Sequence, residues 1–213
     1  ELGQLLAGPF TGTLLADLGA EVIKVEPPKG DNTRQLLGSG AGFYPLFNRN
    51  KKSLTLNLAT PQGREAAHRL VATADIVSHN FRPETMAAQG LDYETLKKIN
   101  PRLIYIELRG FLPGPYEHRT ALDEVVQMMG GLAYMTGPKG QPLRAGSSVN
   151  DIMGGVFGAV AAMAALRERE ITGCGQKVQS ALFENNIFLI AQHMLQYAVT
   201  GKDRKSTRLN SSH

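Results

Sequence analysis

The chain has no tryptophan and only one cysteine, Cys174, among its 213 residues. A single cysteine excludes an internal disulfide framework and a zinc site built from several thiolates. It lies in the sequence TGCGQ, where a small turn residue is a simpler interpretation than a nucleophile. Such low cysteine usage is typical of a reducing compartment, so we expect a cytoplasmic protein.

Several common enzyme motifs are also absent. No GxGxxG follows a strand pattern, and neither GxxxxGK[ST] nor GxSxG occurs. This argues against dinucleotide-binding, P-loop and α/β-hydrolase proteins. The five histidines show no metal-ligand spacing, so we expect no metal site. The longest apolar run, 152–166, is shorter than the roughly 20 residues that cross a bilayer, and no membrane partner is expected.

Acidic and basic residues are nearly balanced once the last ten residues are set aside. The chain carries 23 Lys and Arg against 19 Asp and Glu, but Arg204, Lys205 and Arg208 lie in the polar stretch 204–213. That stretch lacks apolar periodicity, and we interpret it as a non-native or disordered tail. The remaining charge indicates no nucleic-acid partner. The chain starts without a methionine, in a loop-like segment, so we expect it to be truncated at both ends.

Strand patterns alternate with helix patterns along the chain, which is typical of a parallel α/β sheet. The strands are expected at 21–26, 53–58, 75–78, 102–108 and 176–179. The longer helices are expected at 9–18, 61–74, 121–129, 150–169 and 183–199, with two short helices after the third strand and an irregular stretch at 130–149. No internal repeat occurs. We therefore predict one α/β domain over residues 1–200.

Capping residues and small residues mark two of these helices. Thr60 is expected to cap the helix that opens with Pro61 at its first position. Asn150 is expected to cap the long helix that follows it. In that helix Gly154, Gly158 and Ala162 recur every four residues, which predicts a flat face for close packing.

Ligand sites in open α/β sheets lie beyond the carboxyl ends of the strands. Three segments qualify by position: the LLAGP turn at 5–9, the NFR segment at 80–82, and RGF at 109–111. The turn precedes a helix N-terminus, which favours an anionic ligand. Asn80, Phe81 and Arg82 offer an amide, a stacking ring and a guanidinium. Loops that only close the end of a sheet explain the same pattern, so both interpretations stay open here.

Asp151 is the sharpest candidate for chemistry. A carboxylate in the first turn of a helix complements the helix dipole by about 0.3–1 kcal/mol, and this alone can explain the residue. However, the helix looks buried, and the glycines Gly154 and Gly155 leave room for a substrate. A carboxylate can also act as a nucleophile.

Four segments read together resemble the family III CoA-transferases, also called the CaiB–BaiF family. They begin with LLAGPFTGTLLADLGAEVIKVEPP, FNRNKKSLTLNLATP, GLDYETLKKINPRLIYIELRGF and VNDIMGGVFGAVAAM, and they cover 5–28, 47–83, 90–111 and 149–178. The match spans about 5–189, roughly the amino-terminal half of the usual family chain. The order and spacing of the segments make the resemblance specific.

The resemblance implies an α/β fold in which a Rossmann-like parallel sheet with flanking helices forms the large domain. This chain would supply the amino-terminal part of that domain, and full-length chains would interlock as a homodimer. The implied substrates are an acyl-CoA and a small carboxylic acid, so a coenzyme A thioester is a substrate and no cofactor is bound permanently.

The catalytic aspartate of the family falls on Asp151. The implied mechanism is an attack on the acyl-CoA thioester that forms an aspartyl mixed anhydride and releases the CoA thiolate. That thiolate then attacks the anhydride to give an aspartyl-CoA thioester, from which the acceptor acid takes over. This is covalent catalysis by a carboxylate, which needs amide donors for each oxyanion.

The CoA-contacting positions of the family carry over to Leu6, Ala7, Leu56, Asn80 and Phe81. A weaker assignment to a phosphate contact falls on Arg34, which lies in the TR pair that the family commonly has in this region.

The chain departs from the family pattern just before an acidic position that supports the catalytic aspartate and that matches Asp123 here. Family members often have a basic residue and a tyrosine there, where this chain has Thr120, Ala121 and Leu122. Arg119 is placed to substitute for the basic residue.

Two alternatives remain. Racemases of the same family use a histidine beside the aspartate, but the matching Leu122 cannot transfer a proton. His118, one helical turn earlier, could compensate. A non-catalytic Rossmann-like binding module is the second alternative, and the missing dinucleotide motif argues against it.

Overall fold

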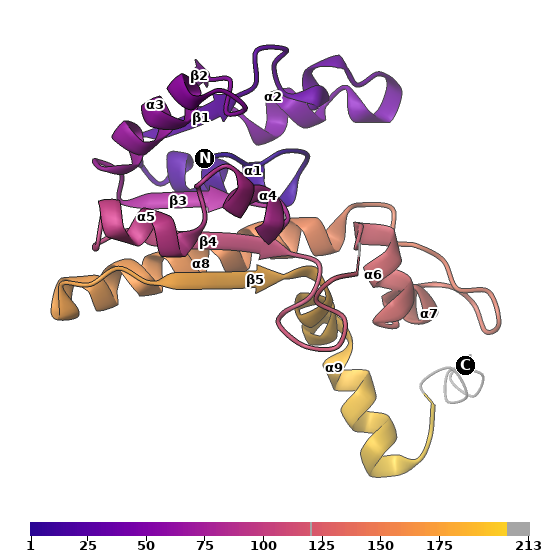
Figure 1. The fold of residues 1–213 in the computed structure, drawn as a ribbon. Coiled ribbons are helices and arrows are strands. Elements are labelled where there is room, and N and C mark those ends of the chain that lie inside the picture. The colour runs from indigo at the N-terminus through magenta and orange to yellow at the C-terminus, as the bar shows by residue number, and fades with distance from the viewer. Residues whose placement is uncertain (120, 204–213) are drawn as a thin grey trace. The chain divides into compact units, whose positions relative to one another are not determined.

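The computed structural model describes residues 1–119 and 121–203, in which parallel strands alternate with helices (Figure 1). This part of the chain divides into two compact units. The first consists of Glu1–Arg109 with Gly154–Ser180, and the second, within the described residues, of 110–119, 121–153 and 181–203. The predicted tail at 204–213 lies outside the described residues. The assignment of 1–200 to one domain stays a prediction.

The strands form two small sheets. The first sheet has the order β1-β2 and the second β3-β4-β5. The strands are β1 (Val22–Glu26), β2 (Lys51–Thr55), β3 (Ile76–His79), β4 (Ile104–Arg109) and β5 (Lys177–Ala181). β1 pairs with β2 and β3 pairs with β4 in parallel, with Ile76 opposite Ile104. All five predicted strands are present, although β2 lies slightly earlier than expected, and the predicted α/β fold class is confirmed.

Helices connect the strands of the first unit. They are α1 (Ala7–Asp17), α2 (Phe43–Phe47), α3 (Pro61–Val71), α4 (Pro83–Ala88), α5 (Tyr93–Ile99) and most of α8 (Val149–Thr172), with two 3-10 turns at Asn32–Gln35 and Gly38–Gly40. The predicted cap of α3 is confirmed, because Thr60 Oγ1 accepts a hydrogen bond of 3.1 Å from the Gly63 N–H.

The core of the first unit lies around β3 and β4. Its largest fully buried side chains include Leu91, Leu96, Leu103 and Tyr105. The Tyr105 hydroxyl remains satisfied in this apolar setting because it donates a hydrogen bond of 2.9 Å to the Leu91 carbonyl. The ends of these strands therefore have a rigid base, from which the following loops extend.

Helix α8 packs closely on α1 through small residues. An added Cβ would lie 2.9 Å from a ring carbon of Phe10 at Gly155 and 2.7 Å from Thr11 Oγ1 at Gly158. The Thr11 hydroxyl lies 3.1 Å from the Gly155 carbonyl. The predicted small-residue face is confirmed at Gly158. By length and composition alone α8 could cross a membrane, a test that the core helix of a soluble protein also passes.

The second unit is helical. It contains α6 (Asp123–Met129), α7 (Leu132–Thr136), the first turn of α8 and α9 (Leu182–Thr200). Asn186 on α9 donates a hydrogen bond of 2.8 Å to the Val126 carbonyl on α6. A Cβ at Gly130 would lie 1.9 Å from Asn186 Nδ2, so only glycine fits there. The stretch predicted to be irregular contains α7, a helix of five residues that follows a left-handed Gly131.

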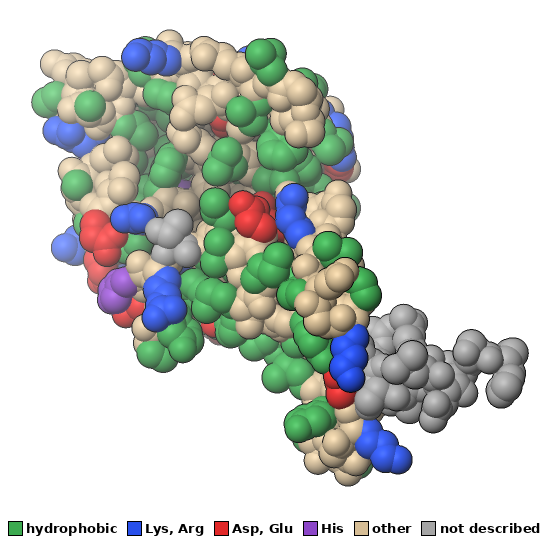
Figure 2. All heavy atoms as spheres, turned by 90° about the vertical axis from the view of Figure 1, so that its right-hand side faces the viewer, with side chains coloured by type: hydrophobic (Ala, Val, Ile, Leu, Met, Phe, Trp, Pro, Cys, Tyr) green, Lys and Arg blue, Asp and Glu red, His purple; other side chains and the backbone are tan. Residues whose placement is uncertain are grey.

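Large apolar side chains remain exposed along α9. Figure 2 shows one face of the molecule, on which many hydrophobic side chains are accessible. The exposed ones on this helix are Phe188, Met194, Leu195, Tyr197 and Val199. Single exposed apolar residues are normal on protein surfaces, but a row of them along one helix is not.

Candidate active site

The start of α8 is held by an acidic residue from α6. Because α8 begins at Val149, Asn150 lies inside its first turn, and the prediction that Asn150 caps the helix is wrong. The Asn150 backbone N–H instead donates a hydrogen bond of 2.8 Å to Asp123 Oδ1. Asn150 is fully buried. Asp123 thus satisfies one of the free N–H groups at this helix end and contacts the residue next to Asp151.

The other oxygen of Asp123 gathers two further side chains. Asp123 Oδ2 accepts hydrogen bonds from Gln127 Nε2 at 2.6 Å and from Arg144 Nη2 at 3.3 Å. The buried Gln127 also accepts the Ala145 N–H at 2.7 Å and donates to the Ser147 carbonyl at 3.2 Å. Helix α6 therefore fixes the segment that leads into α8.

The pKa of Asp151 is raised from 3.8 to about 7. Burial is the largest cause because it penalises the ionised form, and the negative charges of Asp123 and Glu124 add to it, while Arg144 acts in the opposite direction. Within residues 1–119 and 121–203 no hydrogen bond or ion pair engages the Asp151 carboxylate. A half-buried carboxylate that has no partner among these residues is available as a nucleophile.

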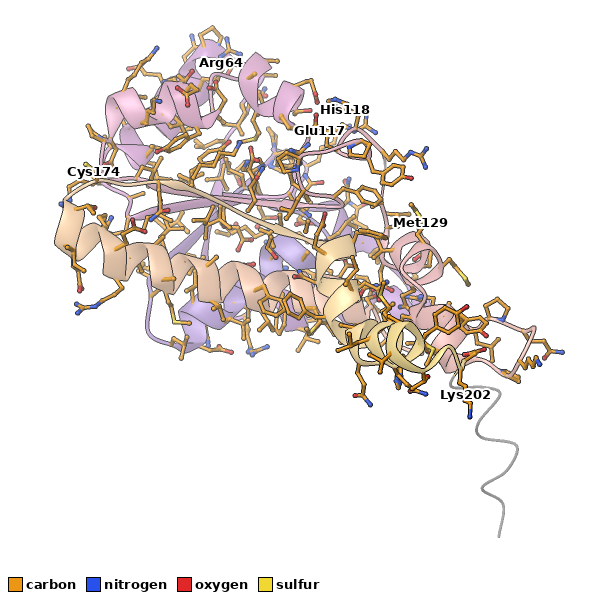
Figure 3. The ribbon with its side chains drawn as sticks, turned by 90° about the horizontal axis from the view of Figure 1, so that it is seen from below. Arg64, Glu117, His118, Met129, Cys174 and Lys202 are labelled. Atoms are coloured by element: carbon orange, nitrogen blue, oxygen red, sulfur yellow. The ribbon has the colours of Figure 1, made fainter. Side chains whose placement is uncertain are left out.

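The other residues predicted near Asp151 are exposed. Arg119 stacks over the Tyr116 ring, with 4.5 Å between the guanidinium carbon and the ring centroid. His118 lies 3.2 Å from Glu117 (Figure 3). Leu122, half exposed, precedes the first residue of α6. A supporting role of Arg119 stays a prediction, and Thr120 lies outside the described residues.

In the first unit, the turn before α1 and the loop after β3 are tied together. The Gln4 N–H donates to Asn80 Oδ1 at 2.9 Å, and Asn80 Nδ2 donates to the Gln4 carbonyl at 2.7 Å. Helix α1 then starts at Ala7 without a side-chain cap at Leu6. The structure therefore brings together Leu6, Ala7 and Asn80, three of the predicted CoA-contacting residues.

Within that turn the predicted residues are buried, and the residue before them is accessible. Leu6 is 3% exposed and Ala7 is 5% exposed. Leu5, by contrast, is half exposed and has a left-handed backbone with φ of 64°. Such a conformation is unfavourable for leucine, and strained residues are common at functional sites. Sequence reasoning missed Leu5, because no local pattern signals a left-handed leucine.

The loop after β3 is held by a hydrogen bond to a buried histidine at the end of that strand. His79 Nδ1 accepts a hydrogen bond of 3.2 Å from the Phe81 N–H. Burial lowers the pKa of His79 to about 4, so the ring is neutral at neutral pH. His79 Nε2 lies 3.9 Å from Glu107, whose other oxygen is 2.9 Å from Lys177. No motif singles out His79, although its place at the end of a strand is a usable signal that the ring lies on a buried face.

Leu56 and Phe81 both pack against the hydrophobic core of the first unit. The Leu56 N–H also donates a hydrogen bond of 2.9 Å to the Glu26 carbonyl, which extends the pairing of β1 and β2 by one residue. Each of these two predicted CoA-contacting residues is thus held at the end of a strand.

Arg34 is engaged in a salt bridge. Its Nε and Nη2 atoms each donate a hydrogen bond of 2.8 Å to the Glu26 carboxylate, and its guanidinium stacks on Tyr44 at 3.9 Å. The Arg34 hydrogen bonds are the largest cause that lowers the pKa of Glu26 to about 2. Two of the nitrogens with which Arg34 could bind a phosphate are therefore occupied, and that predicted role stays untested.

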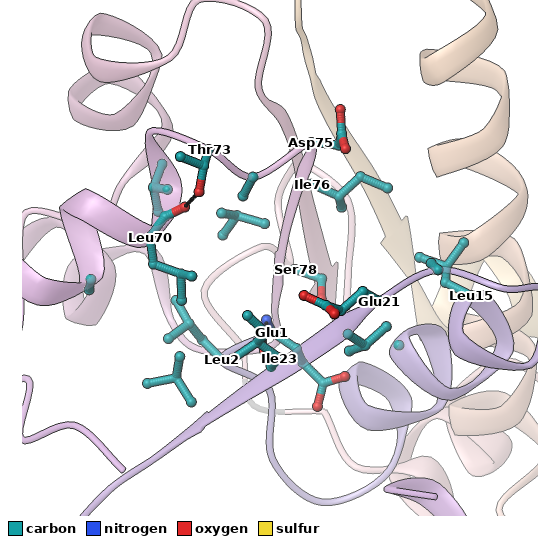
Figure 4. Close-up of a pocket in the computed structure, with 18 of the residues that line it drawn as sticks. Glu1, Leu2, Leu15, Glu21, Ile23, Leu70, Thr73, Asp75, Ile76 and Ser78 are labelled. Carbon is teal, nitrogen blue, oxygen red and sulfur yellow. Dashed lines mark hydrogen bonds between the residues drawn. The ribbon is translucent and has the colours of Figure 1, made fainter. Parts of the chain in front are cut away.

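A cavity of about 370 Å³ lies between β1 and β3 (Figure 4). Its walls include Ile23, Leu70 and Ile76, with the carboxylates of Glu21 and Asp75 among its few charged groups. None of the predicted site residues lines it. Among the described residues, no cluster of three or more His, Cys, Asp or Glu side chains is suited to hold a metal ion.

The sequence and the fold both agree with one known family. The chain belongs to CoA-transferase family III, whose model matches residues 1–213. It is 42% identical to a succinyl-CoA–D-citramalate CoA-transferase of Chloroflexus aurantiacus, over 97% of this chain and 53% of that protein. It is 39% identical to a succinate–glutarate CoA-transferase of Agrobacterium fabrum, over 100% of this chain and 56% of that protein.

The solved structures agree with the relatives. A CaiB/BaiF family protein from Brucella suis superimposes with a TM-score of 0.90 at 41% identity, over 96% of this chain and 57% of that chain. The predicted family is thus confirmed. The chain spans about half the length of the curated relatives that it matches.

Proposed function

We propose that the full-length protein, meaning this chain together with the remaining half that its relatives have, is a CoA-transferase that moves coenzyme A from an acyl-CoA to a carboxylic acid. The feature that carries the proposal is the half-buried carboxylate of Asp151, which has no partner among the described residues and whose pKa is raised to about 7 by desolvation. The names of the relatives support it, since they describe transfer of CoA between carboxylic acids.

The first half of the proposed reaction moves CoA onto the protein. One Asp151 oxygen attacks the thioester carbonyl, the C–S bond breaks, and the CoA thiolate leaves a mixed anhydride between the acyl group and Asp151. The thiolate then attacks the aspartyl carbonyl of the anhydride. This releases the donor acid as its carboxylate and leaves Asp151 as a CoA thioester.

The second half reverses these steps with a different acid. The acceptor carboxylate attacks the aspartyl thioester and expels the CoA thiolate, which forms a second anhydride. The thiolate attacks the acceptor's carbonyl carbon, which gives the new acyl-CoA and returns Asp151 as a carboxylate. No water, proton donor or redox partner enters the balance, so a site with little water around Asp151 suits it.

The surrounding residues have positioning roles in this proposal. Asp123 fixes the first turn of α8 through Asn150, so the Asp151 carboxylate is held at a helix N-terminus, where the dipole stabilises negative charge. In the first unit, the proposal assigns the CoA moiety to the turn at Leu6 and Ala7, where α1 starts without a side-chain cap, and Asn80 keeps that turn in place.

Further parts of the proposal concern the whole protein. It includes a homodimer in the cytoplasm, with acyl-CoA and a small acid as substrates and no permanently bound cofactor. A racemase of the same family is disfavoured because Leu122, at the position of the proton-transferring histidine, has no group that exchanges protons. Deuterium at the α-carbon of a 2-methylacyl-CoA incubated in deuterated solvent would favour the racemase instead.

The mechanism is tested by trapping its intermediates. The full-length protein is incubated with an acyl-CoA and then with hydroxylamine, which converts an aspartyl anhydride or thioester into a hydroxamate. Peptide mass spectrometry is expected to find the hydroxamate on Asp151 and to find none in Asp151→Asn. A modification at another residue, with Asp151 unmodified, would refute the assigned mechanism.

A further inference from the structure

Arg144 is a cationic side chain beside the Asp151 cluster to which sequence reasoning assigned no role. It lies in the segment between α7 and α8, and its side chain is 42% exposed although it pairs with the buried Asp123. Its Nη2 atom donates to Asp123 Oδ2 at 3.3 Å and to Ser148 Oγ at 3.2 Å. The guanidinium is thus fixed at one nitrogen.

The rest of the guanidinium is uncommitted. In the part of the chain that the structure describes, no hydrogen bond or ion pair engages its Nε or Nη1 atoms. These N–H groups remain able to donate to a ligand. A planar guanidinium that is held at Nη2 and still has N–H donors on Nε and Nη1 is suited to bind a carboxylate.

The guanidinium also lies close to the start of α8. The Ile152 N–H donates to the Ser148 carbonyl at 3.0 Å, so Ser148 occupies the position just before the helix. Asp151 follows Ser148 by three residues, which places both on one side of the first turn. The guanidinium that donates to Ser148 therefore lies on the same side of the helix start as Asp151.

The charges around Asp151 determine whether a second carboxylate of a substrate can bind there. The groups that act on Asp151 are the acidic Asp123 and Glu124 and the basic Arg144. A second carboxylate on a substrate would be repelled by the acidic groups, so it needs a cation with free donors to remain near Asp151. Arg144 is the basic group in this set.

We propose that Arg144 binds the distal carboxylate of a dicarboxylic substrate while the proximal carboxyl group reacts at Asp151. This inference rests on the proposed CoA transfer and extends it to a substrate class, short dicarboxylic acids and their CoA thioesters. The two relatives named above agree with it, since succinate, citramalate and glutarate each carry two carboxyl groups.

The test compares acids with one and two carboxylates in the full-length protein. In Arg144→Gln, kcat/KM for glutarate as CoA acceptor is expected to fall about 30- to 100-fold, the loss of a charge-assisted hydrogen-bonded contact. The value for butyrate is expected to change less than about threefold. In Arg144→Lys, which keeps the charge but loses the planar guanidinium, kcat/KM for glutarate is expected to lie between the values of the wild type and of Arg144→Gln.

Arg49→Gln is the matched control. The Arg49 side chain is also 42% exposed and also pairs with an aspartate, Asp17, but it is not part of the Asp151 cluster. It should leave the glutarate-to-butyrate ratio unchanged. An equal loss for glutarate and butyrate in Arg144→Gln would show that Arg144 acts only on structure or on the pKa of Asp151, and would overturn the inference. Wild-type values for both acids in Arg144→Gln would overturn it as well.

A binding measurement separates this inference from the proposed function. Calorimetric titration with glutarate and with butyrate requires no turnover. If the wild-type protein transfers no CoA, the proposed function fails, while tighter glutarate binding that is lost in Arg144→Gln still supports the carboxylate site. If glutarate binds the wild type no more tightly than the variant does, the carboxylate site is refuted even in an active enzyme.

Discussion

The two units treat carboxylates that are shielded from solvent in opposite ways. In the first unit the buried Glu26 accepts hydrogen bonds from Arg34, Tyr44 and Ser53, and its pKa falls to about 2. In the second unit the half-buried Asp151 has no such partner among the described residues, and its pKa rises to about 7. A carboxylate with every lone pair engaged stabilises a loop, whereas one left uncommitted retains its reactivity. The comparison therefore distinguishes Glu26, called here the structural acid, from Asp151, called the chemical acid, by the hydrogen-bond partners of their carboxylates.

The largest effect is expected from removing the chemical acid. Asp151→Asn in the full-length protein should lower kcat for CoA transfer by at least about 10³-fold, because an amide cannot form the anhydride. Steady-state assays measure this, and circular dichroism should show an unchanged fold. Asp75→Asn, at an exposed acid paired with Arg169, is the control and should keep its activity. Substantial CoA-transfer activity in Asp151→Asn would contradict the role of Asp151 as the chemical acid.

Removing the structural acid should instead cost stability. Glu26→Gln removes the charge that pairs with Arg34 at a buried carboxylate, so the free energy of unfolding should fall by about 1–3 kcal/mol. The lowered pKa of Glu26 adds a pH dependence: its stabilisation is present above about pH 4.5 and is lost as the pH falls toward 2. Urea denaturation of wild type and variant measures both. Equal stability at pH 7 would contradict the structural role.

The raised pKa of Asp151 predicts a pH dependence of the rate, and a pH dependence of stability whose sign is opposite to that expected for Glu26. Only the ionised form attacks the thioester, so kcat/KM should rise about tenfold per pH unit below 7 and level off above it. The folded state holds this proton where the unfolded state has lost it, so stability should decline from about pH 4 to pH 7. Asp151→Asn should therefore be more stable than wild type at pH 8, by roughly 1–3 kcal/mol. A flat rate profile between pH 5 and 9 would count against the assignment.

The smallest effect concerns the binding turn of the first unit. Asn80→Ala removes both hydrogen bonds to Gln4, so the turn at Leu6 and Ala7 loses its tether. We expect KM for acyl-CoA to rise about three- to tenfold with little change in kcat. An equal fall in kcat would show instead that the turn affects the chemical step.

The elements of the fold were largely predictable because their signals are local. Alternating residues mark β1, and the pair Thr60–Pro61 marks α3. Helix α7 was missed because five residues between glycines carry no helical period. Asn150 was misassigned as a cap because Ser148, two residues earlier, is an equally good capping residue.

The site was less predictable because its contacts join distant residues. The local pattern left Asp151 with a helix-dipole explanation, and only the resemblance raised it to a nucleophile. The pairing of Arg34 with Glu26 and the contact of Arg144 with Asp123 each connect different elements. Side-chain partners of this kind are set by tertiary packing, which no sequence period encodes.

The anchoring of the 144–148 segment by Gln127 has a consequence for redesign. Gln127 binds Ala145 and Ser147, whereas the residues 138–142 just before this segment are exposed. Exposed loop tips tolerate exchange and insertion. Grafting new sequences at 138–142 is therefore a route to altered acceptor choice in which the nucleophile and its supports keep their places.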